Sequence, residues 1–343
     1  MNIGLKGNDF LSLKEFDLSS PDESNVVLLL GENKSGKTQA LKLVYSFLSA
    51  LSEAQFEKRI ISIKKENTNY LEIFHPLFYH ELETNFVHAG FGASWGNGSD
   101  LNIIFRCNEI VYQENKNSKQ KVIEDKYNAL IGKTIAISPN GFGDYYKGIF
   151  AIQRFYADNA IFSNYISDLV YDLFIVSDAK RKKDSDRFTQ ELNEIVTIIN
   201  ADFNISDNKI IVMEKGKEYP LEAVASGLKT FAPLILAMKH GLIEDTLIID
   251  EPEVSLHPAW IEVMAELLYK ISKKGVKVFI ATHSDVFIEK MNWFLKHDAE
   301  FNLDVWKFER KEDGNHARTL ELEDREVPTA EYLKVYYEIV KGF

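Results

Sequence analysis

The sequence predicts an α/β fold built on a largely parallel sheet with helices on both faces. An unbroken apolar run at residues 26–30 leads into a glycine-rich segment and then a helical pattern, as expected for a central buried strand. In the last third of the chain, two more apolar runs alternate with helical patterns, an order typical of parallel, helix-covered sheets. These later strands are expected at residues 246–250 and 276–281, and their helices at 226–240 and 258–272.

The other segments are expected to surround this core within a single domain spanning residues 1–343. Alternating apolar residues before the first buried strand predict an N-terminal β-hairpin. Residues 37–51 carry an apolar stripe with a period of 3.6 residues, which predicts a helix packed on the sheet.

Two inserted segments are predicted between the first strand and the last third of the chain. The first is a β-rich insertion at residues 52–150, and the second is a helical lid subdomain at residues 151–220 that also contains a hairpin around Gly216. Phe86, Phe91 and Trp95 in the first segment are expected to be packing residues rather than a base-stacking platform. Within the two segments, strands are expected at 60–63, 71–78 and 101–105, a loop at 90–98, a turn at 138–144 and helices between 161 and 200.

Composition excludes several classes of protein. The formal net charge of −12 argues against a surface that binds nucleic acid everywhere, although a local basic patch stays open. The single cysteine, Cys107, excludes an intrachain disulfide and favours a reducing, cytoplasmic location. No apolar run approaches the ~18 residues of a membrane-spanning helix, so no membrane insertion is expected.

Residues 31–38 fit the phosphate-loop pattern G-x-x-x-x-G-K-[ST] and lie between an apolar strand and a predicted helix, as that motif requires. Backbone N–H groups of such a loop and the N-terminus of the following helix converge on phosphate oxygens. Lys37 would neutralise the β- and γ-phosphates, and the Thr38 hydroxyl would bind Mg²⁺. The predicted nucleotide-binding residues of the loop are Gly31, Asn33, Lys34, Ser35, Gly36, Lys37 and Thr38.

A pair of carboxylates ends the predicted strand 246–250. Asp250 would hold the Mg²⁺ or its water shell opposite Thr38, and Glu251 would point at the γ-phosphate and polarise the attacking water. Two acids can also begin a loop by chance. The surrounding Asp-Glu-Pro-Glu, followed by Ser-Leu-His-Pro, favours the catalytic interpretation.

Two further motifs match a nucleotide site. His283 follows the predicted strand 276–281, and ligands of open α/β sheets bind at the carboxyl ends of strands. A lone histidine is more often structural, but this position after Asp250 and Glu251 suits contact with a γ-phosphate. Ser226-Gly227 opens a predicted helix; such a pair is often a simple helix cap, yet a hydroxyl at a helix N-terminus also suits a phosphate.

Together these motifs resemble those of the ABC-class P-loop ATPases. They are most similar to the SMC-related, OLD (overcoming lysogenization defect)-like branch of AAA-type ATPases, because Glu-Pro-Glu-x-x-Leu-His-Pro at 251–258 and Ala-Thr-His-Ser at 281–284 are characteristic of that branch. The resemblance covers residues 1–52 and 220–290. It implies an ABC-ATPase head with a mixed sheet, ATP and Mg²⁺ as cofactors, and hydrolysis of ATP to ADP and phosphate.

The resemblance also implies a site shared between two subunits. One subunit would supply the phosphate loop, Asp250, Glu251 and His283, and the other would supply Ser226-Gly227. ATP would then close a head-to-head homodimer, and hydrolysis would reopen it. The family has a glutamine-bearing loop that contacts the metal, and Gln153 is the candidate for that residue. Some relatives append a TOPRIM nuclease domain, for which the sixty residues after His283 leave no room.

Three residues depart from the family pattern. Lys34 stands where the family usually has glycine, Thr38 where it often has serine, and Ala225 where many relatives have serine or glycine. Threonine keeps the metal-binding hydroxyl, whereas Ala225 leaves the contact across the dimer less defined and Lys34 has no explanation in the sequence.

The leading functional hypothesis is a switch ATPase that controls a separately encoded effector protein or a nucleic-acid target, in phage defence or genome maintenance. The ATP-binding subunit of a membrane transporter is an alternative, although the longer Leu-Ser-Gly-Gly-Gln signature of that class is absent. A third hypothesis is a nucleotide-dependent scaffold with negligible turnover, against which Glu251 argues. Nucleic acid could contact basic residues at 58–59, 64–65 and 180–183, although the last group is more typical of a solvated loop.

Overall fold

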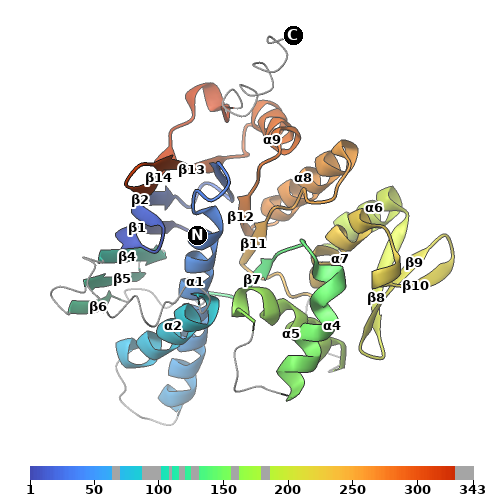
Figure 1. Ribbon diagram of the computed structural model, residues 1–343, viewed down its shortest axis with the longest axis horizontal. Helices are drawn as coiled ribbons and strands as arrows, with labels where there is room; N and C mark the ends of the chain where they lie inside the picture. The colour runs from blue at the N-terminus through green and yellow to red at the C-terminus, as the bar shows by residue number, and fades with distance from the viewer. Residues whose placement is uncertain are drawn as a thin grey trace.

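The computed structural model describes residues 1–63, 70–86, 102–107, 110–115, 120–124, 131–155, 162–178 and 186–328. These residues form one large mixed sheet, one small antiparallel sheet, and helices that pack against both (Figure 1). The predicted α/β class is confirmed. The large sheet contains β1 (Ile3–Phe10), β2 (Leu13–Ser20), β3 (Val26–Gly31), β4 (Asn102–Cys107), β5 (Ile110–Asn115), β6 (Gln120–Glu124), β7 (Thr134–Ile137), β11 (Thr246–Asp250), β12 (Lys277–Ala281), β13 (Leu303–Lys311) and β14 (Gly314–Leu320).

The small sheet and the helices complete the described elements. The small sheet, in the order β10-β9-β8, confirms the hairpin predicted around Gly216. Its strands are β8 (Ala201–Ser206), β9 (Lys209–Glu214) and β10 (Lys217–Pro220). The α-helices are α1 (Lys37–Ile63), α2 (Tyr70–Phe86), α4 (Phe142–Phe155), α5 (Asn164–Asp178), α6 (Thr189–Ile199), α7 (Ser226–Lys239), α8 (Pro258–Lys273) and α9 (Asp285–His297). None of the helices in these described ranges is long and apolar enough to cross a bilayer.

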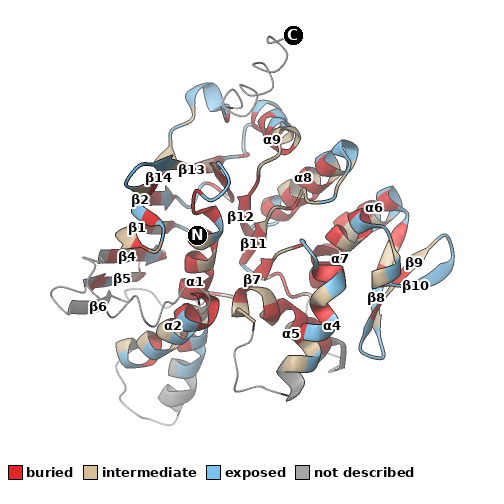
Figure 2. Ribbon diagram, in the orientation of Figure 1, coloured by how far each residue is buried: buried red, intermediate tan, exposed pale blue. Residues whose placement is uncertain are grey.

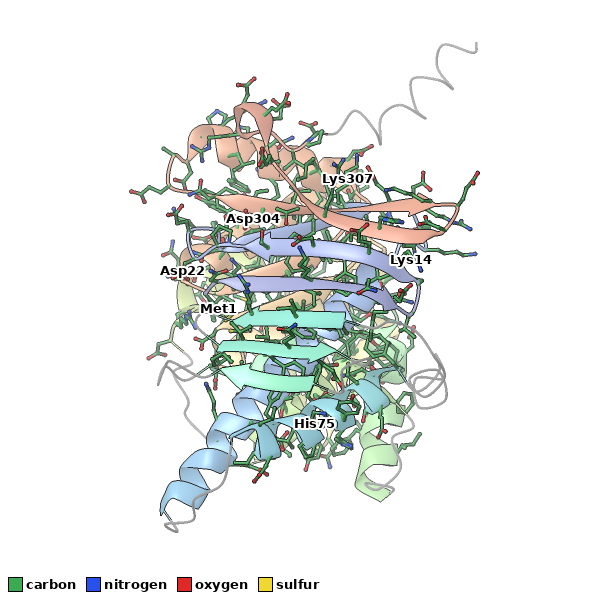
Figure 3. All side chains as sticks on the ribbon, turned by 90° about the vertical axis from the view of Figure 1, so that its left-hand side faces the viewer. Met1, Lys14, Asp22, His75, Asp304 and Lys307 are labelled. Atoms are coloured by element: carbon green, nitrogen blue, oxygen red, sulfur yellow. The ribbon has the colours of Figure 1, made fainter. Side chains whose placement is uncertain are left out.

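The large sheet has a parallel part and a mostly antiparallel part. Its order is β6-β5-β4-β1-β2-β14-β13-β3-β12-β11-β7. From β13 to β7 every neighbouring pair is parallel, whereas β1, β2, β4, β5 and β6 pair antiparallel and include the predicted N-terminal hairpin. Figure 3 looks onto the antiparallel part, with Lys14 on β2 and with Asp304 and Lys307 on β13.

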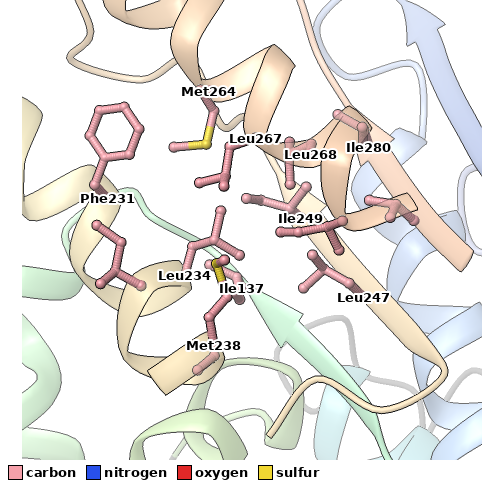
Figure 4. Close-up of a cluster of buried hydrophobic side chains, with 14 of the residues drawn as sticks. Ile137, Phe231, Leu234, Met238, Leu247, Ile249, Met264, Leu267, Leu268 and Ile280 are labelled. Carbon is pink, nitrogen blue, oxygen red and sulfur yellow. The ribbon is translucent and has the colours of Figure 1, made fainter. Parts of the chain in front are cut away.

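Both faces of the parallel strands are buried, which explains their unbroken apolar sequences. Along β3, Val26, Leu28 and Leu30 contact the core on the side of α7 and α8, and the alternate residues Val27 and Leu29 contact the core on the side of α1. Figure 2 shows these central strands buried along their length. Figure 4 shows the first of these cores, in which side chains of α7 and α8 pack on β7, β11 and β12.

The described residues correct several predictions for the segment 52–150. Residues 60–63 are the end of α1, and residues 71–78 lie in α2, so the two strands predicted there are wrong. The buried side chains Phe74, Phe78 and Leu82 recur every four residues, a helical spacing that the aromatic content of the segment concealed. Pro76 lies inside α2, where a proline removes one backbone hydrogen bond.

The remaining predictions for the two inserted segments have mixed outcomes. The strand at 101–105 is confirmed as β4, and the turn at 138–144 is confirmed up to Gly141, after which α4 begins. Helices at 161–200 are confirmed as α5 and α6. Phe86 is buried against the edge of Phe10, as a packing residue. Phe91, Trp95, the loop at 90–98 and the basic residues at 64–65 and 180–183 lie outside the described residues. The division of the chain at 52–150 and 151–220 stays a prediction.

Candidate nucleotide-binding site

Three adjacent parallel strands bring the predicted site residues to one edge of the sheet. In the register of β3, β12 and β11, Leu29 lies beside Ala281, and Ala281 lies beside Asp250. The phosphate loop, the acidic motif and His283 follow these three strand ends directly. Segments about 250 residues apart in the sequence therefore meet where ligands of α/β sheets bind.

Lys37 is the first residue of α1 and is almost fully buried, with 6% of its surface exposed. Its ammonium donates to the carbonyl oxygens of Gly31 at 2.7 Å and of Glu32 at 3.0 Å. Burial lowers the pKa of Lys37 to about 8, because the charged form loses its hydration, while the nearby carboxylates of Asp250 and Glu251 oppose this shift. The side chain thus lies against its own loop, ready to donate to an anionic ligand.

The backbone of the phosphate loop is fixed by its fit against neighbouring strands. Gly36 has a φ of +102°, and a Cβ atom there would lie 2.6 Å from Cδ2 of Leu13 on β2. Lys34 has a φ of +67°, a conformation that favours glycine. Its carbonyl oxygen accepts a hydrogen bond of 3.0 Å from the Asn315 side chain of β14. The left-handed backbone suits glycine, which is the residue that the resemblance leads us to expect at the position of Lys34.

Other loop residues supply polar groups for a phosphate. Ser35 is buried, and its hydroxyl oxygen has no hydrogen-bond partner within the described part of the chain. A buried hydroxyl is costly without a partner, and an incoming phosphate oxygen would accept its proton. Asn33 lies on the exposed side of the same loop.

Thr38 and Asp250 form the candidate Mg²⁺ site. The Thr38 hydroxyl donates to Oδ2 of Asp250 at 2.9 Å, so α1 and β11 are joined there. Burial raises the pKa of Asp250 to about 6, and the neighbouring Glu251 adds to the rise, while the hydrogen bond from Thr38 opposes it. A hydroxyl and a carboxylate at this distance are oxygen ligands of the kind that Mg²⁺ prefers, so the residues fit that ion.

Glu251 and His283 lie side by side beyond the strand ends. Oε1 of Glu251 is 3.7 Å from Nε2 of His283. The Glu251 backbone has a φ of +55°, and its N–H donates to the Ala281 carbonyl at 2.8 Å. Burial and the charge of Lys37 lower the pKa of His283, which keeps the imidazole neutral near pH 7 and able to accept or donate one hydrogen bond.

Glu253 and Asn315 position this site and were not predicted from the sequence. Oε1 of Glu253 accepts a 2.7 Å hydrogen bond from the backbone N–H of His283, and burial raises the pKa of this carboxyl. Asn315 donates both to the Lys34 carbonyl and to the hydroxyl of Ser12, at 3.0 and 2.9 Å. The sequence contained a signal for Glu253, because it is the last acid of the Asp-Glu-Pro-Glu motif, whereas no local sequence pattern indicated a role for Asn315.

Ser226 and Gly227 begin α7, with Ala225 at the N-cap. Ala225 and Ser226 are exposed, whereas Gly227 is buried against Trp260 of α8, where an added Cβ would lie 2.9 Å from the indole ring. The Thr230 hydroxyl donates to the Val254 carbonyl at 2.9 Å, so this end of α7 rests on the loop after Asp250. Gln153 lies in α4, and its side chain is outside the described residues.

The solved structures that this chain resembles include heads of SMC proteins. A "Crystal structure of the SmcHead bound to the C-winged helix domain of ScpA" matches with a TM-score of 0.51 at 14% identity, over 93% of this chain and 98% of that chain. The "SMC head domain from Thermotoga maritima" matches with a TM-score of 0.45 at 11% identity, over 93% and 98%. The first likeness confirms the ABC-ATPase-head fold predicted from the sequence. No curated protein matches the chain.

Residues 117–289 match the protein family described as "AAA domain, putative AbiEii toxin, Type IV TA system". The matched segment contains Ser226-Gly227, Asp250, Glu251 and His283, and it begins after the phosphate loop. The match covers just over half of the chain. This protein therefore belongs to that family of AAA-type P-loop ATPase domains.

Proposed function

We propose that this protein is a switch ATPase that binds ATP with Mg²⁺, closes into a head-to-head homodimer, and reopens when ATP is hydrolysed. The observation that carries the proposal is the meeting of Thr38, Asp250, Glu251 and His283 beside the phosphate loop at one edge of the sheet. These are the groups that phosphoryl transfer to water needs.

Each residue has a role that follows from its position. Backbone N–H groups of the loop and the Lys37 ammonium would bind the phosphates, and Thr38 and Asp250 would hold Mg²⁺, which neutralises charge on the phosphate oxygens. Glu251 would orient the attacking water and accept its proton. His283, held by Glu253 through its backbone N–H, would donate a hydrogen bond to an oxygen of the γ-phosphate.

The dimer is proposed because the described half-site leaves Ser226 exposed at the start of α7. An exposed hydroxyl at a helix N-terminus can bind the γ-phosphate held by a second copy. Membership of the family and the likeness to SMC heads support this arrangement. A subunit alone would hydrolyse ATP slowly, since its site would lack these ligands. We extend the proposal to Gln153 as a metal contact, on the resemblance alone.

The test is size-exclusion chromatography of Glu251→Gln with and without ATP and Mg²⁺. This variant should bind ATP, fail to hydrolyse it, and elute as a dimer only with ATP, whereas Lys37→Ala should elute as a monomer throughout. If Glu251→Gln elutes identically with and without nucleotide, the proposed dimer switch is wrong. If the wild type dimerises with ATP but shows no turnover, the protein is a scaffold rather than an enzyme.

The biological role is a further part of the proposal. We place the chain in the OLD-like branch and propose that it controls a partner effector or a nucleic-acid target in phage defence or genome maintenance. The family description, which names a toxin of a type IV toxin–antitoxin system, supports a defence role. Rates of ATP hydrolysis with and without double-stranded DNA at two salt concentrations would separate a nucleic-acid target from a protein effector.

A further inference from the structure

A large pocket lies at the opposite end of the parallel strands from the phosphate loop. Its volume is about 750 Å³, the size of a site for a small organic molecule. It is bounded by α1, α2 and α5, by residues 131–134 at the start of β7, and by Glu244 and Asp245 just before β11. The nucleotide residues lie instead at the carboxyl ends of these strands, so the pocket is separate from the proposed ATP site.

Carboxyl groups dominate the polar lining of this pocket. Glu244 and Asp245 accept hydrogen bonds from the backbone N–H groups of Lys133 and Gly132, at 2.9 and 2.7 Å. The Lys133 ammonium is paired with Asp172 at 2.6 Å, which offsets its charge. Three more acids, from three different helices, line the pocket: Glu53 of α1, Glu81 of α2 and Asp168 of α5.

Two of the three acids, Glu81 and Asp168, are held in place by neutral hydrogen-bond donors. Asn85 and Asn164 donate to the two oxygens of Glu81, at 3.0 and 3.3 Å. The hydroxyl of Tyr45, on α1, donates to Asp168. Burial raises the pKa of Glu81 to about 8 and of Asp168 to about 6, because the charged carboxylates lose their hydration, while the hydrogen bond from Tyr45 and the charge of Lys133 oppose the rise at Asp168.

The lining also offers an unused acceptor and apolar surface. Thr134 on β7 is 2% exposed, and its hydroxyl has no hydrogen-bond partner in the described part of the structure. Ile131 and Phe56 supply apolar contact, and Phe56 is 64% exposed despite its large ring. Acceptors together with apolar surface suit a ligand that combines N–H donors with an aliphatic body.

We propose that this pocket binds a small organic cation that carries two or more amine or guanidinium groups on an aliphatic chain. The volume far exceeds that of a single ion. Among the described residues, no group of three histidine, cysteine, aspartate or glutamate side chains is arranged to hold a metal ion. Carboxyl oxygens on α1, α2 and α5 are instead separated hydrogen-bond acceptors that match the separated N–H groups of a polyamine, and a bound cation would favour the charged form of Glu81.

The test is isothermal titration of the full chain with spermidine, without nucleotide, so that it does not depend on the proposed ATPase. Glu53→Gln and Asp168→Asn should each weaken binding about tenfold, the loss expected when one partly buried charge pair is removed. Glu57→Gln is the matched control: Glu57 lies one turn further along α1 and does not line the pocket, so binding should stay within about twofold.

Three results would overturn the proposal. Wild type could show no binding of spermidine, all three variants could bind it equally, or Mg²⁺ at matched ionic strength could displace it. The second result would indicate attraction to the net charge of −12 rather than a site, and the third would indicate a simple ion site. Glu53 is exposed at the pocket mouth, so Glu53→Gln keeps the test valid even if Asp168→Asn does not fold.

Discussion

The two halves of the proposed nucleotide site differ in how completely one chain builds them. On the phosphate-loop side, Lys37 is buried against loop carbonyls, and Thr38 is joined to Asp250 across the sheet edge. On the other side, Ser226 is exposed at the first turn of α7, and only Gly227 is fixed, against Trp260. In the proposed site, one half is arranged within a single chain, and the other half is an exposed surface that a second chain would meet.

This contrast separates affinity from turnover. Pre-formed donors such as Lys37 should set how tightly a single subunit binds nucleotide, because no further conformational entropy is lost in positioning them when the nucleotide binds. Exposed donors such as Ser226 should act only when a second subunit arrives, so they should affect hydrolysis and leave the affinity of a single subunit for ATP unchanged. Substitutions on the two sides therefore have different expected signatures.

The largest effect is expected from Lys37→Ala. It removes a buried ammonium whose hydrogen bonds to phosphate are worth about 1.5–3 kcal/mol each, so affinity for ATP should fall about a hundredfold or more. Titration with a fluorescent ATP analogue measures the affinity. A circular dichroism melt serves as the control, because Lys37 also bonds Gly31 and Glu32. Near-normal affinity in a folded variant would contradict the assignment of the loop.

Ser226→Arg should affect turnover and spare binding. An arginine at the start of α7 would block close approach of a second subunit, so hydrolysis should fall about tenfold or more. The affinity for ATP, measured at protein concentrations too low for dimers, should change less than about twofold. Ser206→Arg, the same change at an exposed position of β8, is the control and should leave both unchanged. Equal turnover in the two variants would show that Ser226 is not part of the catalytic site.

A smaller effect is expected from Asn315→Ala. The amide of Asn315 holds the Lys34 carbonyl and the Ser12 hydroxyl, and its loss should let the phosphate loop relax. If ordering the loop again costs about 1 kcal/mol of the binding free energy, the affinity for ATP should fall about fivefold. Unchanged affinity would mean that the loop is rigid without β14.

The smallest effect is expected from Lys34→Gly. A left-handed backbone costs a non-glycine residue about 1–2 kcal/mol, and glycine removes this cost. Glycine also makes the unfolded chain more flexible, which favours unfolding and offsets part of the gain. The free energy of unfolding should therefore rise by about 0.5 kcal/mol. Urea unfolding measures the change. Lys217→Gly, at an exposed position of β10 without a positive φ, should instead lower stability. A loss of stability in both would show that Lys34 is not strained.

Local sequence patterns were sufficient for the formed half of the site. The strand ends at Gly31, Asp250 and Ala281 lie within a residue or two of their predicted positions, because each buried strand is an apolar run that stops at a polar motif. The predicted helix 37–51 is confirmed, but it continues to Ile63. The prediction ended too early because the apolar stripe gives way to charged residues after Leu51, and no capping residue marks the true end of the helix.

Tertiary contacts explain what the sequence could not predict. Asn315 reaches Lys34 across 281 residues of sequence, and a local pattern carries no information about such a contact. The strands predicted at 60–63 and 71–78 fail because short aromatic and β-branched runs suit either a strand or a buried helix. In the segment 71–78, the packing of Phe74 and Phe78 against Phe47 of α1 stabilises the helix.

The central claim, that each active site needs two copies of the chain, is tested most directly by mixing two inactive variants. Lys37→Ala keeps an intact Ser226. Ser226→Ala removes the hydroxyl without the bulk of an arginine and keeps an intact phosphate loop, so the subunits can approach and one of the two sites in a mixed dimer is complete. The mixture should recover about a quarter of wild-type ATPase activity at equal concentrations. Lys37→Ala mixed with Glu251→Gln should recover none, because both changes lie on the same side of the site. If the first mixture is no more active than the sum of its parts, the shared-site account is wrong.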